Sequence, residues 1–439
     1  MAGAAADRAA YPPQVSPGRR PRPRLLADLS PLRESRDYRL LFAGHAVSFL
    51  GSQMTLVAMP YQVYRLTRSS LAVGMASLAA LLPLLALSLL GGSIADAVDR
   101  RRLLLVAQLL LAATSAGLAL NAGSRHPAVW PIFVLGALSA GLAGVDLPTR
   151  NAMMPNLVRR ELFPAASALT QIRMQLGLAV GPALAGLVIA RVGLAGAYWA
   201  DVASFGVSAV AAWAISPQPP EGGGTRAGIA SVREGLRYLR GQRLLVGTFV
   251  IDLNAMGFGM PRALFPALGT GLFHGGPATV GLLYAAPGAG ALVGAVFTGW
   301  VGRVRRQGAA VVAAVMAWGA AIVVFGLVPW LPLGLLLLAV AGAADMVSAV
   351  FRSTILQLSL PDALRGRISA VHIAVVTSGP RLGDVESGVA AALTTPRFSV
   401  VSGGVACVLG ALVVARLVPE LARYDARAAT AASTSREPG

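Results

Sequence analysis

The sequence contains no lysine, so all 37 of its basic residues are arginines. A Walker-type phosphate loop needs a lysine on the β- and γ-phosphates, and its absence excludes an ordinary ATP-driven pump within this chain. Cys407 is the single cysteine, which excludes an internal disulfide. The sequence also lacks a zinc-binding helix motif, a nucleophile elbow and a cysteine cluster. We therefore expect no catalytic activity, no metal and no cofactor.

Charge is scarce too: only 13% of the 439 residues are charged, whereas 55% are hydrophobic and the mean hydropathy is +0.66. Such a chain has too little polar surface to coat a water-soluble globule, so lipid must be its main solvent. The net charge of +18 comes from arginines in loops beside apolar stretches, not from one aromatic-rich face. This distribution argues against a nucleic-acid partner and favours contact with anionic membrane lipid.

Twelve apolar stretches, each of about 18 to 26 residues, are long enough to cross a bilayer as helices. Helix is the expected geometry because unpaired backbone groups are too costly in hydrocarbon. The first six stretches are Leu40 to Val63, Leu71 to Ala95, Leu103 to Ala122, Ala128 to Val145, Ala165 to Ala190 and Leu194 to Ile215. The second six are Leu244 to Leu268, Ala278 to Val301, Ala309 to Val328, Leu331 to Val350, Ile368 to Leu393 and Phe398 to Val418. We predict an all-α integral membrane protein with twelve transmembrane helices.

Arginine crowds every second loop, while the intervening loops hold only Arg65, Arg68, Arg125, Arg191 and Arg397. Short basic loops stay in the cytoplasm, so we expect both tails to be cytoplasmic and the protein to lie in a bacterial cytoplasmic membrane. The expected organisation is a disordered tail (1–37), a six-helix bundle (38–215), a linker (216–243), a second six-helix bundle (244–418) and a second tail (419–439). The first tail lacks the apolar core of a signal peptide. The linker contains an amphipathic pattern formed by Ile229, Val232, Leu236 and Leu239, which favours a surface helix over disorder.

The two sets of stretches repeat each other at a nearly constant offset. Arg150, Gly177, Gly181 and Gly186 correspond to Arg352, Gly379, Gly383 and Gly388, and Met59 and Pro60 correspond to Met260 and Pro261. A parallel duplication of six helices predicts two similar bundles related by a pseudo-twofold axis, with a substrate site between them.

A short loop follows the second stretch and carries Gly92, Asp96, Asp99, Arg100, Arg101 and Arg102. It resembles the loop signature of the major facilitator superfamily, although Ala97 and Asp99 depart from the usual basic residue and glycine. The resemblance implies the twelve-helix facilitator fold and a gating contact between Asp96 and the helix that begins near Ile368. A stop-transfer charge cluster is the simpler alternative.

The fifth stretch carries Gly177, Gly181, Pro182 and Gly186. This spacing permits close helix packing and is similar to the glycine-proline signature of antiporters in the same superfamily. Plain small-residue packing is the alternative. The runs Asp345 to Arg352, Pro361 to Arg367 and Gly379 to Gly383 resemble the enterobactin-exporter-like group of facilitators, which implies export of a small organic molecule.

Charged and polar residues inside the stretches are the functional candidates, because each charge costs about 2.5–3.5 kcal/mol to insert unless it is paired or wetted. They are Asp252, Arg173, Gln53, Asn254, Asp201 and Arg381. Asp252 is the first candidate for proton coupling, since a proton-coupled transporter needs a carboxylate that exchanges protons. The alternative is that Arg173 or Arg381 neutralises Asp252 across the bundle. Asp146 and Arg150 are spaced as a structural pair on one helix.

We therefore hypothesise a proton-coupled, alternating-access exporter of a small organic molecule such as a siderophore, a drug or a secondary metabolite. Alternatives within transport are a uniporter and a lipid flippase. Alternatives of another class are a passive channel and a non-transporting membrane scaffold.

Overall fold

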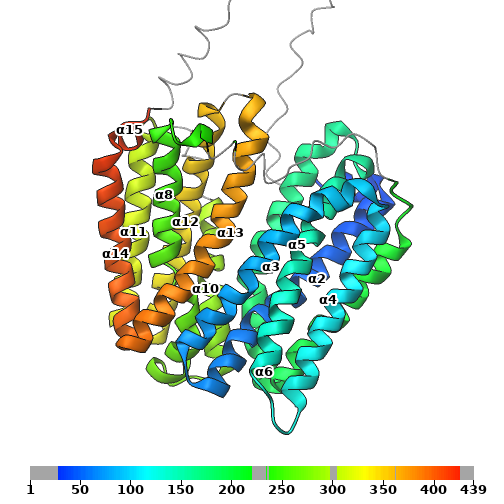
Figure 1. The fold of residues 1–439 in the computed structure, drawn as a ribbon, viewed down its shortest axis with the longest axis horizontal. Coiled ribbons are helices and arrows are strands. Elements are labelled where there is room, and N and C mark those ends of the chain that lie inside the picture. Colours follow the sequence, from blue (N-terminus) through cyan, green and yellow to red (C-terminus); the bar gives the residue numbers. More distant parts are fainter. Residues whose placement is uncertain (1–27, 220–233, 235–236, 297–303, 361, 426–439) are drawn as a thin grey trace, which may run out of the picture.

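The computed structural model describes residues 28–219, 234, 237–296, 304–360 and 362–425, and every regular element in these ranges is helical (Figure 1). The first half contains α1 (Ser30–Glu34), α2 (Arg36–Thr67), α3 (Ser70–Ala97), α4 (Arg100–Gly123), α5 (Trp130–Leu157), η1 (Arg160–Leu162) and α6 (Phe163–Ala214). The second half contains α8 (Arg243–Phe258), η2 (Arg262–Leu264), α9 (Phe265–Ala267), η3 (Leu268–Leu272), α10 (Pro277–Val296), α11 (Gln307–Leu327), α12 (Leu331–Ser359), α13 (Asp362–Leu393), α14 (Pro396–Leu417) and α15 (Pro419–Ala422). The prediction of an all-α membrane fold is confirmed.

Ten helical segments of the described chain are long and apolar enough to cross a membrane. One of them, Arg160–Ala214, has 55 residues and is long enough for two crossings. The helix α13 is not among the ten, because polar side chains such as Arg381 and Asp384 lower its hydropathy, yet its 32 residues pack among the others. Counting α6 twice and adding α13 gives a total consistent with the twelve crossings predicted.

The long helix α6 is a hairpin of two helices joined at one residue. Gly193 breaks the helix with φ 85° and ψ 178°, a conformation that residues with a side chain rarely adopt. Before the break, Gly177 faces Phe49 of α2, and after the break Asp201 faces Thr55 of the same helix. Further along α6, Ser208 lies back beside Gly44, near the start of α2. The two arms therefore run in opposite directions along α2, and the break falls between the two stretches predicted there.

Side-chain caps fix where several helices begin. Ser69 accepts a hydrogen bond from the amide of Ala72 (3.2 Å) at the start of α3, and Thr395 accepts one from Phe398 (3.1 Å) at the start of α14. These bonds satisfy amides that have no partner within the helix, so the connections can be very short. The helix α1 lies in a segment for which we expected a disordered tail. The predicted amphipathic linker helix falls largely on residues outside the described ranges, and of its pattern the described Leu239 packs against Leu245.

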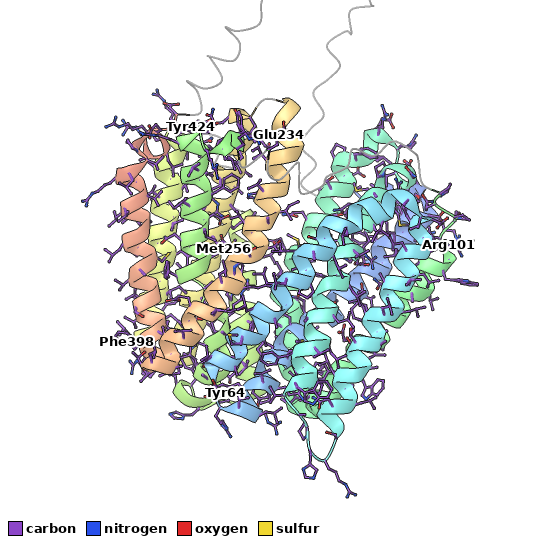
Figure 2. All side chains as sticks on the ribbon, in the orientation of Figure 1. Tyr64, Arg101, Glu234, Met256, Phe398 and Tyr424 are labelled. Atoms are coloured by element: carbon purple, nitrogen blue, oxygen red, sulfur yellow. The ribbon has the colours of Figure 1, made fainter. Side chains whose placement is uncertain are left out.

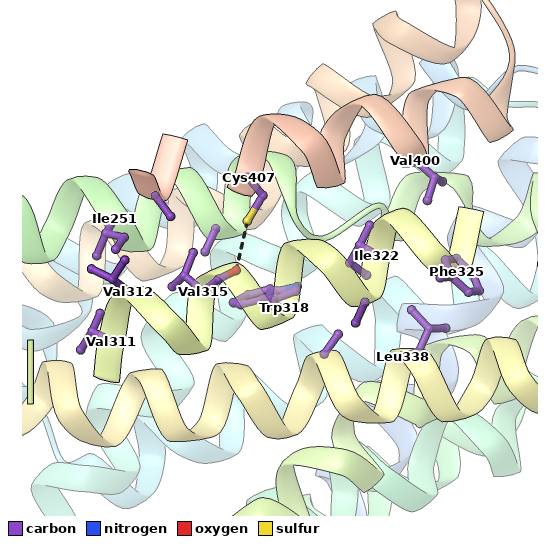
Figure 3. Packing of buried hydrophobic residues seen from close by; sticks show 14 of the residues in the cluster. Ile251, Val311, Val312, Val315, Trp318, Ile322, Phe325, Leu338, Val400 and Cys407 are labelled. Atoms are coloured by element: carbon purple, nitrogen blue, oxygen red, sulfur yellow. Dashed lines mark hydrogen bonds between the residues drawn. The ribbon is translucent and has the colours of Figure 1, made fainter. Parts of the chain in front are cut away.

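Apolar clusters fill each half, and one cluster of the first half also includes Ala263 and Val280 of the second. The largest cluster fills the second half between α8, α11, α12 and α14, and Figure 3 shows part of it around Trp318. Trp318 is 1% exposed, and its indole N–H donates to the carbonyl of Gly259 (2.7 Å). Cys407 is fully buried in this cluster, beside the carbonyl of Val315. This packing holds the helices of the second half together.

The two halves meet near one end and diverge toward the other (Figure 1). We call the end that holds the α3–α4 turn and α15 the tail side, and the end that holds the α2–α3 turn and Gly193 the opposite side. Figure 2 places Arg101 and Tyr424 at the tail side and Tyr64 and Phe398 at the opposite side. The two most extensive helix contacts between the halves are α3 with α13 and α6 with α10, and we call these two contacts the seam.

Small residues allow the close approach at the seam. A Cβ on Gly186 of α6 would lie 2.9 Å from Gly281 of α10, and a Cβ on Gly388 of α13 would lie 2.9 Å from the carbonyl of Ser70. These residues come from the opposite-side parts of their helices. The seam is therefore closed on the opposite side of the molecule.

Candidate functional site

A buried cluster of charges lies within the second half. Arg352 of α12 is 4% exposed, and its Nη2 lies 2.8 Å from Oδ1 of Asp252 on α8, which is 1% exposed. The same Nη2 lies 3.7 Å from Oδ1 of Asp345, whose side chain remains partly accessible. Arg352 Nη1 also donates to the hydroxyl of Ser348 (3.0 Å). One guanidinium thus serves two carboxylates, and we call Asp252, Arg352 and Asp345 the charge triad.

The first half contains a similar but balanced pair. Arg150 Nε lies 2.9 Å from Oδ2 of Asp146, four residues earlier on α5, as the spacing predicted. Gln108 donates to the other oxygen of Asp146 (2.6 Å), and Arg150 donates to the hydroxyl of Ser208 (3.1 Å). Arg150 and Arg352 are the two arginines that correspond in the internal repeat. The charge triad differs from the pair in carrying a second carboxylate.

The alternative partners considered for Asp252 lie elsewhere. Arg173 of α6 stacks over the ring of Phe49, with its Cζ 5.4 Å from the ring centre. Arg381 of α13 donates to the carbonyl of Thr377 on its own helix (2.9 Å). The interpretation that one of them neutralises Asp252 is therefore wrong, because Arg352 takes that place. Arg352 is the last residue of the motif Asp345 to Arg352, but nothing in the local sequence pattern indicates that its side chain reaches α8.

Asp201 and Asn254 point into the interiors of their own halves. Asp201 is 1% exposed and accepts hydrogen bonds from the hydroxyls of Thr55 (2.6 Å), Ser115 (2.8 Å) and Ser204 (3.3 Å). Three donors compensate the desolvation of this carboxylate. Asn254 donates to the carbonyl of Cys407 (2.9 Å) and so joins α8 to α14. Neither residue lies among those that line the pocket between the halves.

A pocket of about 110 Å³ lies between the halves and takes its lining from both. Gln53 is its polar residue from the first half, while the second half supplies Arg262, Tyr284 and Asp345. The apolar lining consists of Leu56, Leu178, Pro182, Met260, Phe265, Pro287, Gly288, Ala291 and Gly342. Of the predicted site residues, Gln53 and Pro182 line this pocket, and the charge triad reaches it through Asp345. Sequence reasoning missed Arg262, although an arginine within an apolar stretch is a signal that was available.

The loop between α3 and α4 is bound to the first half and to the start of the linker. Asp99 caps α4 by accepting from the amide of Arg102 (3.0 Å), and its other oxygen accepts from the amide of Gln218 (3.1 Å). Arg100 donates to the carbonyl of Ala152 (3.1 Å), and Arg101 donates to the carbonyl of Trp213 near the end of α6. Gly92 and Asp96 lie on α3, but their side chains are outside the described part of the structure. The predicted contact of Asp96 with the helix that begins near Ile368 therefore stays a prediction.

The glycine-proline residues of α6 face two different helices. Gly177 and Gly181 lie against Phe49 and Gln53 of α2, within the first half. Gly186 lies against α10 of the second half, and the carbonyl of Pro182 lies close to Gly281. This segment therefore joins packing inside one half to the seam between the halves.

Comparison with known proteins supports the family resemblance found in the sequence. Residues 26–438 match the family model described as transmembrane secretion effector. The chain is 29% identical over 399 residues to the enterobactin exporter EntS of Citrobacter koseri. The aligned region covers 91% of this chain and 96% of the relative. The chain is 28% identical over the same shares to the enterobactin exporter EntS of Shigella boydii serotype 18.

Solved structures support the fold. A mutant form of the nucleoside transporter NupG matches with a TM-score of 0.71 at 11% identity, over 86% of this chain and 99% of that one. The D-xylose-proton symporter matches with a TM-score of 0.66 at 16% identity, over 88% of this chain and 98% of that one. A bacterial homologue of the human lysosomal transporter Spinster, in an inward-facing and unoccupied conformation, matches with a TM-score of 0.67 at 14% identity. The match covers 88% of this chain and 98% of that one.

Proposed function

Since the chain belongs to the family of transmembrane secretion effectors within the major facilitator superfamily, we propose that it is a secondary transporter that exports a small organic molecule. The observation that carries this proposal is the pocket between the halves, which takes polar residues from both. A site shared by two rigid bundles changes its access when the bundles rock against each other. Membership in a family of transporters also agrees with the expectation that the chain is not an enzyme.

Orientation follows from the arginine-rich loops. We propose that the tail side faces the cytoplasm of a bacterium and that the opposite side faces outward. With the seam closed on the opposite side, this conformation would receive cargo from the cytoplasm. An exporter must adopt such a conformation to load its cargo.

The charge triad supports coupling to protons. Asp252 and Asp345 share Arg352, so the triad itself carries one net negative charge, and the next cation that acts on Asp345, Arg262 of the same pocket, is beyond ion-pair distance. A buried charge without a counter-ion is costly, and one bound proton restores the balance. We propose that Asp345 takes this proton, because it has the longer ion-pair distance and lines the pocket where cargo binds. The membrane potential supplies about 2.3 kcal/mol per charge per 100 mV to such an exchange.

The test uses everted membrane vesicles and, as the first compound, enterobactin, which the EntS relatives export. We expect enterobactin to accumulate inside the vesicles when a pH gradient is imposed, and we expect Asp345→Asn to abolish this accumulation. The matched control is Glu386→Gln on α13, a half-buried carboxylate outside the pocket and the charge triad. Accumulation that ignores the gradient in the wild type, and survives both Asp345→Asn and Asp252→Asn, would rule out proton coupling and leave a uniporter.

A further inference from the structure

Asp384 is a buried carboxylate at the seam that neither the family resemblance nor the proposed coupling uses. It lies on α13 and is 8% exposed. Its Oδ2 accepts a hydrogen bond from the hydroxyl of Ser77 on α3 (2.5 Å), across the boundary between the halves. Its Oδ1 accepts a hydrogen bond from the amide of Ala263 in η2 (3.1 Å). A single side chain thus joins three elements of the two halves.

The bond to Ser77 belongs to the closed part of the seam. One turn earlier on α3, Gly74 lies against the main chain of Asp384 so closely that a Cβ there would collide with its carbonyl oxygen. Gly388, one turn later on α13, lies against the main chain of Ser70. If the opposite side opens, α3 and α13 must separate here, and the Ser77–Asp384 bond must break.

The bond to Ala263 belongs to the wall of the pocket. Ala263 lies in the turn that follows α8, between residues that line the pocket: Met260 and Arg262 on one side and Phe265 on the other. Tyr284, a further pocket residue, donates to the carbonyl of Arg262 in the same turn (2.9 Å). The position of this turn therefore sets where Arg262 lies in the pocket wall.

We infer that Asp384 is a positioning residue that links the pocket to the seam: it holds the pocket turn through Ala263 and the closed seam through Ser77. Movement of the turn when cargo binds beside Arg262 would pull on the carboxylate that holds α3. The link would then make opening of the opposite side depend on an occupied pocket. Only this last step rests on the proposed transport function, because the two bonds and their effect on opening exist without cargo.

The surroundings of Asp384 favour a fixed bridging role. Arg262 and Arg381 are close enough to interact with it electrostatically, yet neither forms an ion pair within 4.0 Å among the described residues. Its hydrogen bonds go instead to a hydroxyl and a main-chain amide on two other elements. Hydrogen bonds to an ionised group are stronger than those between neutral groups, which suits a contact that must hold two helices in register.

The experiment measures opening of the opposite side in lipid nanodiscs, with the full chain and without cargo. Spin labels are attached at Arg125→Cys, in the exposed loop between α4 and α5, and at Thr394→Cys, exposed at the end of α13. The background carries Cys407→Ala, which removes the single native thiol. Pulsed electron-spin resonance then measures the distance between the two labels. The open-to-closed ratio is the population of molecules at the long distance divided by the population at the short distance.

We expect Ser77→Ala to raise the open-to-closed ratio by about tenfold, as the loss of one hydrogen bond to a charged group predicts. Ser88→Ala is the matched control, since Ser88 lies on the same helix and donates to the carbonyl of Leu85 within it. Asp384→Ala should raise the ratio at least as much, and adding Ser77→Ala to it should have no further effect. A Ser77→Ala ratio equal to that of Ser88→Ala overturns the inference.

A second label separates the two bonds. On the same Cys407→Ala background, a spin label at Met260→Cys reports the mobility of the pocket turn. Asp384→Ala should increase this mobility, because it removes the acceptor of the Ala263 amide, while Glu386→Ala on the same helix should not. Unchanged mobility in Asp384→Ala would show that Asp384 does not position the turn. Failure to export any tested compound would count against the proposed function alone, since neither label experiment requires cargo.

Discussion

The two buried arginines predict opposite responses to the same chemical change. Asp345→Asn removes the more distant of the two carboxylates that face Arg352 and leaves the Asp252–Arg352 pair at 2.8 Å. Asp146→Asn removes the carboxylate that lies 2.9 Å from Arg150, and no second carboxylate is within 4.0 Å of Arg150 in the described chain. The first substitution restores charge balance, whereas the second destroys it.

The magnitudes follow from burial. Arg150 and Arg352 are each 4% exposed, so neither can be solvated by water if it loses its partner. Breaking a buried pair by removing one member lowers stability by about 3–5 kcal/mol. Asp146 is 14% exposed and Gln108 stays beside it, so we expect a loss of about 3 kcal/mol in Asp146→Asn. Asp345 is 26% exposed, and we expect Asp345→Asn to change stability by less than about 1 kcal/mol.

Cys407 provides the assay. It is the single cysteine of the chain and is fully buried, so a thiol-reactive fluorophore labels it only when the second half opens. The midpoint of labelling during heating should fall by several degrees in Asp146→Asn if the halves unfold together, and stay near the wild-type value in Asp345→Asn. Intrinsic tryptophan fluorescence gives a second readout that does not depend on one half. Equal losses in the two variants would refute the charge count of the triad.

Three further perturbations test the packing. Gly193→Ala should lower the midpoint, because its positive φ strains a residue with a side chain by about 1–2 kcal/mol. Gly186→Ala should raise the open-to-closed ratio across the seam, since its Cβ would press on α10, while Gly206→Ala, which has no atom within 4 Å, should not. Ser115→Ala should lower the free energy of unfolding by about 1–3 kcal/mol, and with it the midpoint of labelling, because Asp201 loses one of its three hydroxyl donors. A midpoint equal to wild type in either stability variant would contradict its assigned contact.

The length and spacing of the apolar stretches were enough to predict most of the helices and the break in α6. Both signals are local, since a crossing needs a fixed length and a glycine can end a helix within one residue. They did not predict that the stretch Leu244 to Leu268 divides into α8, η2 and α9. The repeat also placed Arg150 and Arg352 in corresponding positions, and both are buried and bound to carboxylates.

The partners of the charges were not predictable in the same way. Asp252 and Arg352 are a hundred residues apart, and their contact depends on how α8 and α12 are rotated about their axes. Asp384 and Glu386 stand two residues apart on one helix, and nothing in their spacing tells that Asp384 is the one held by Ser77 and Ala263. A single sequence gives no measure of such rotations. The sequence therefore indicated Asp252, a member of the charge triad, as the first candidate, but it did not indicate that Arg352 is the partner of Asp252.

The hairpin in α6 has a practical consequence for engineering this chain. A single glycine forms the whole connection between the two arms of α6. This connection therefore has no loop into which an epitope, a protease site or a fluorescent domain can be inserted. Residues 124–129, which join α4 to α5 on the same side, include an exposed stretch that such an insertion can occupy. A reporter placed there would reveal which face of the membrane this side occupies while leaving the arm that carries Gly186 in place against its neighbour.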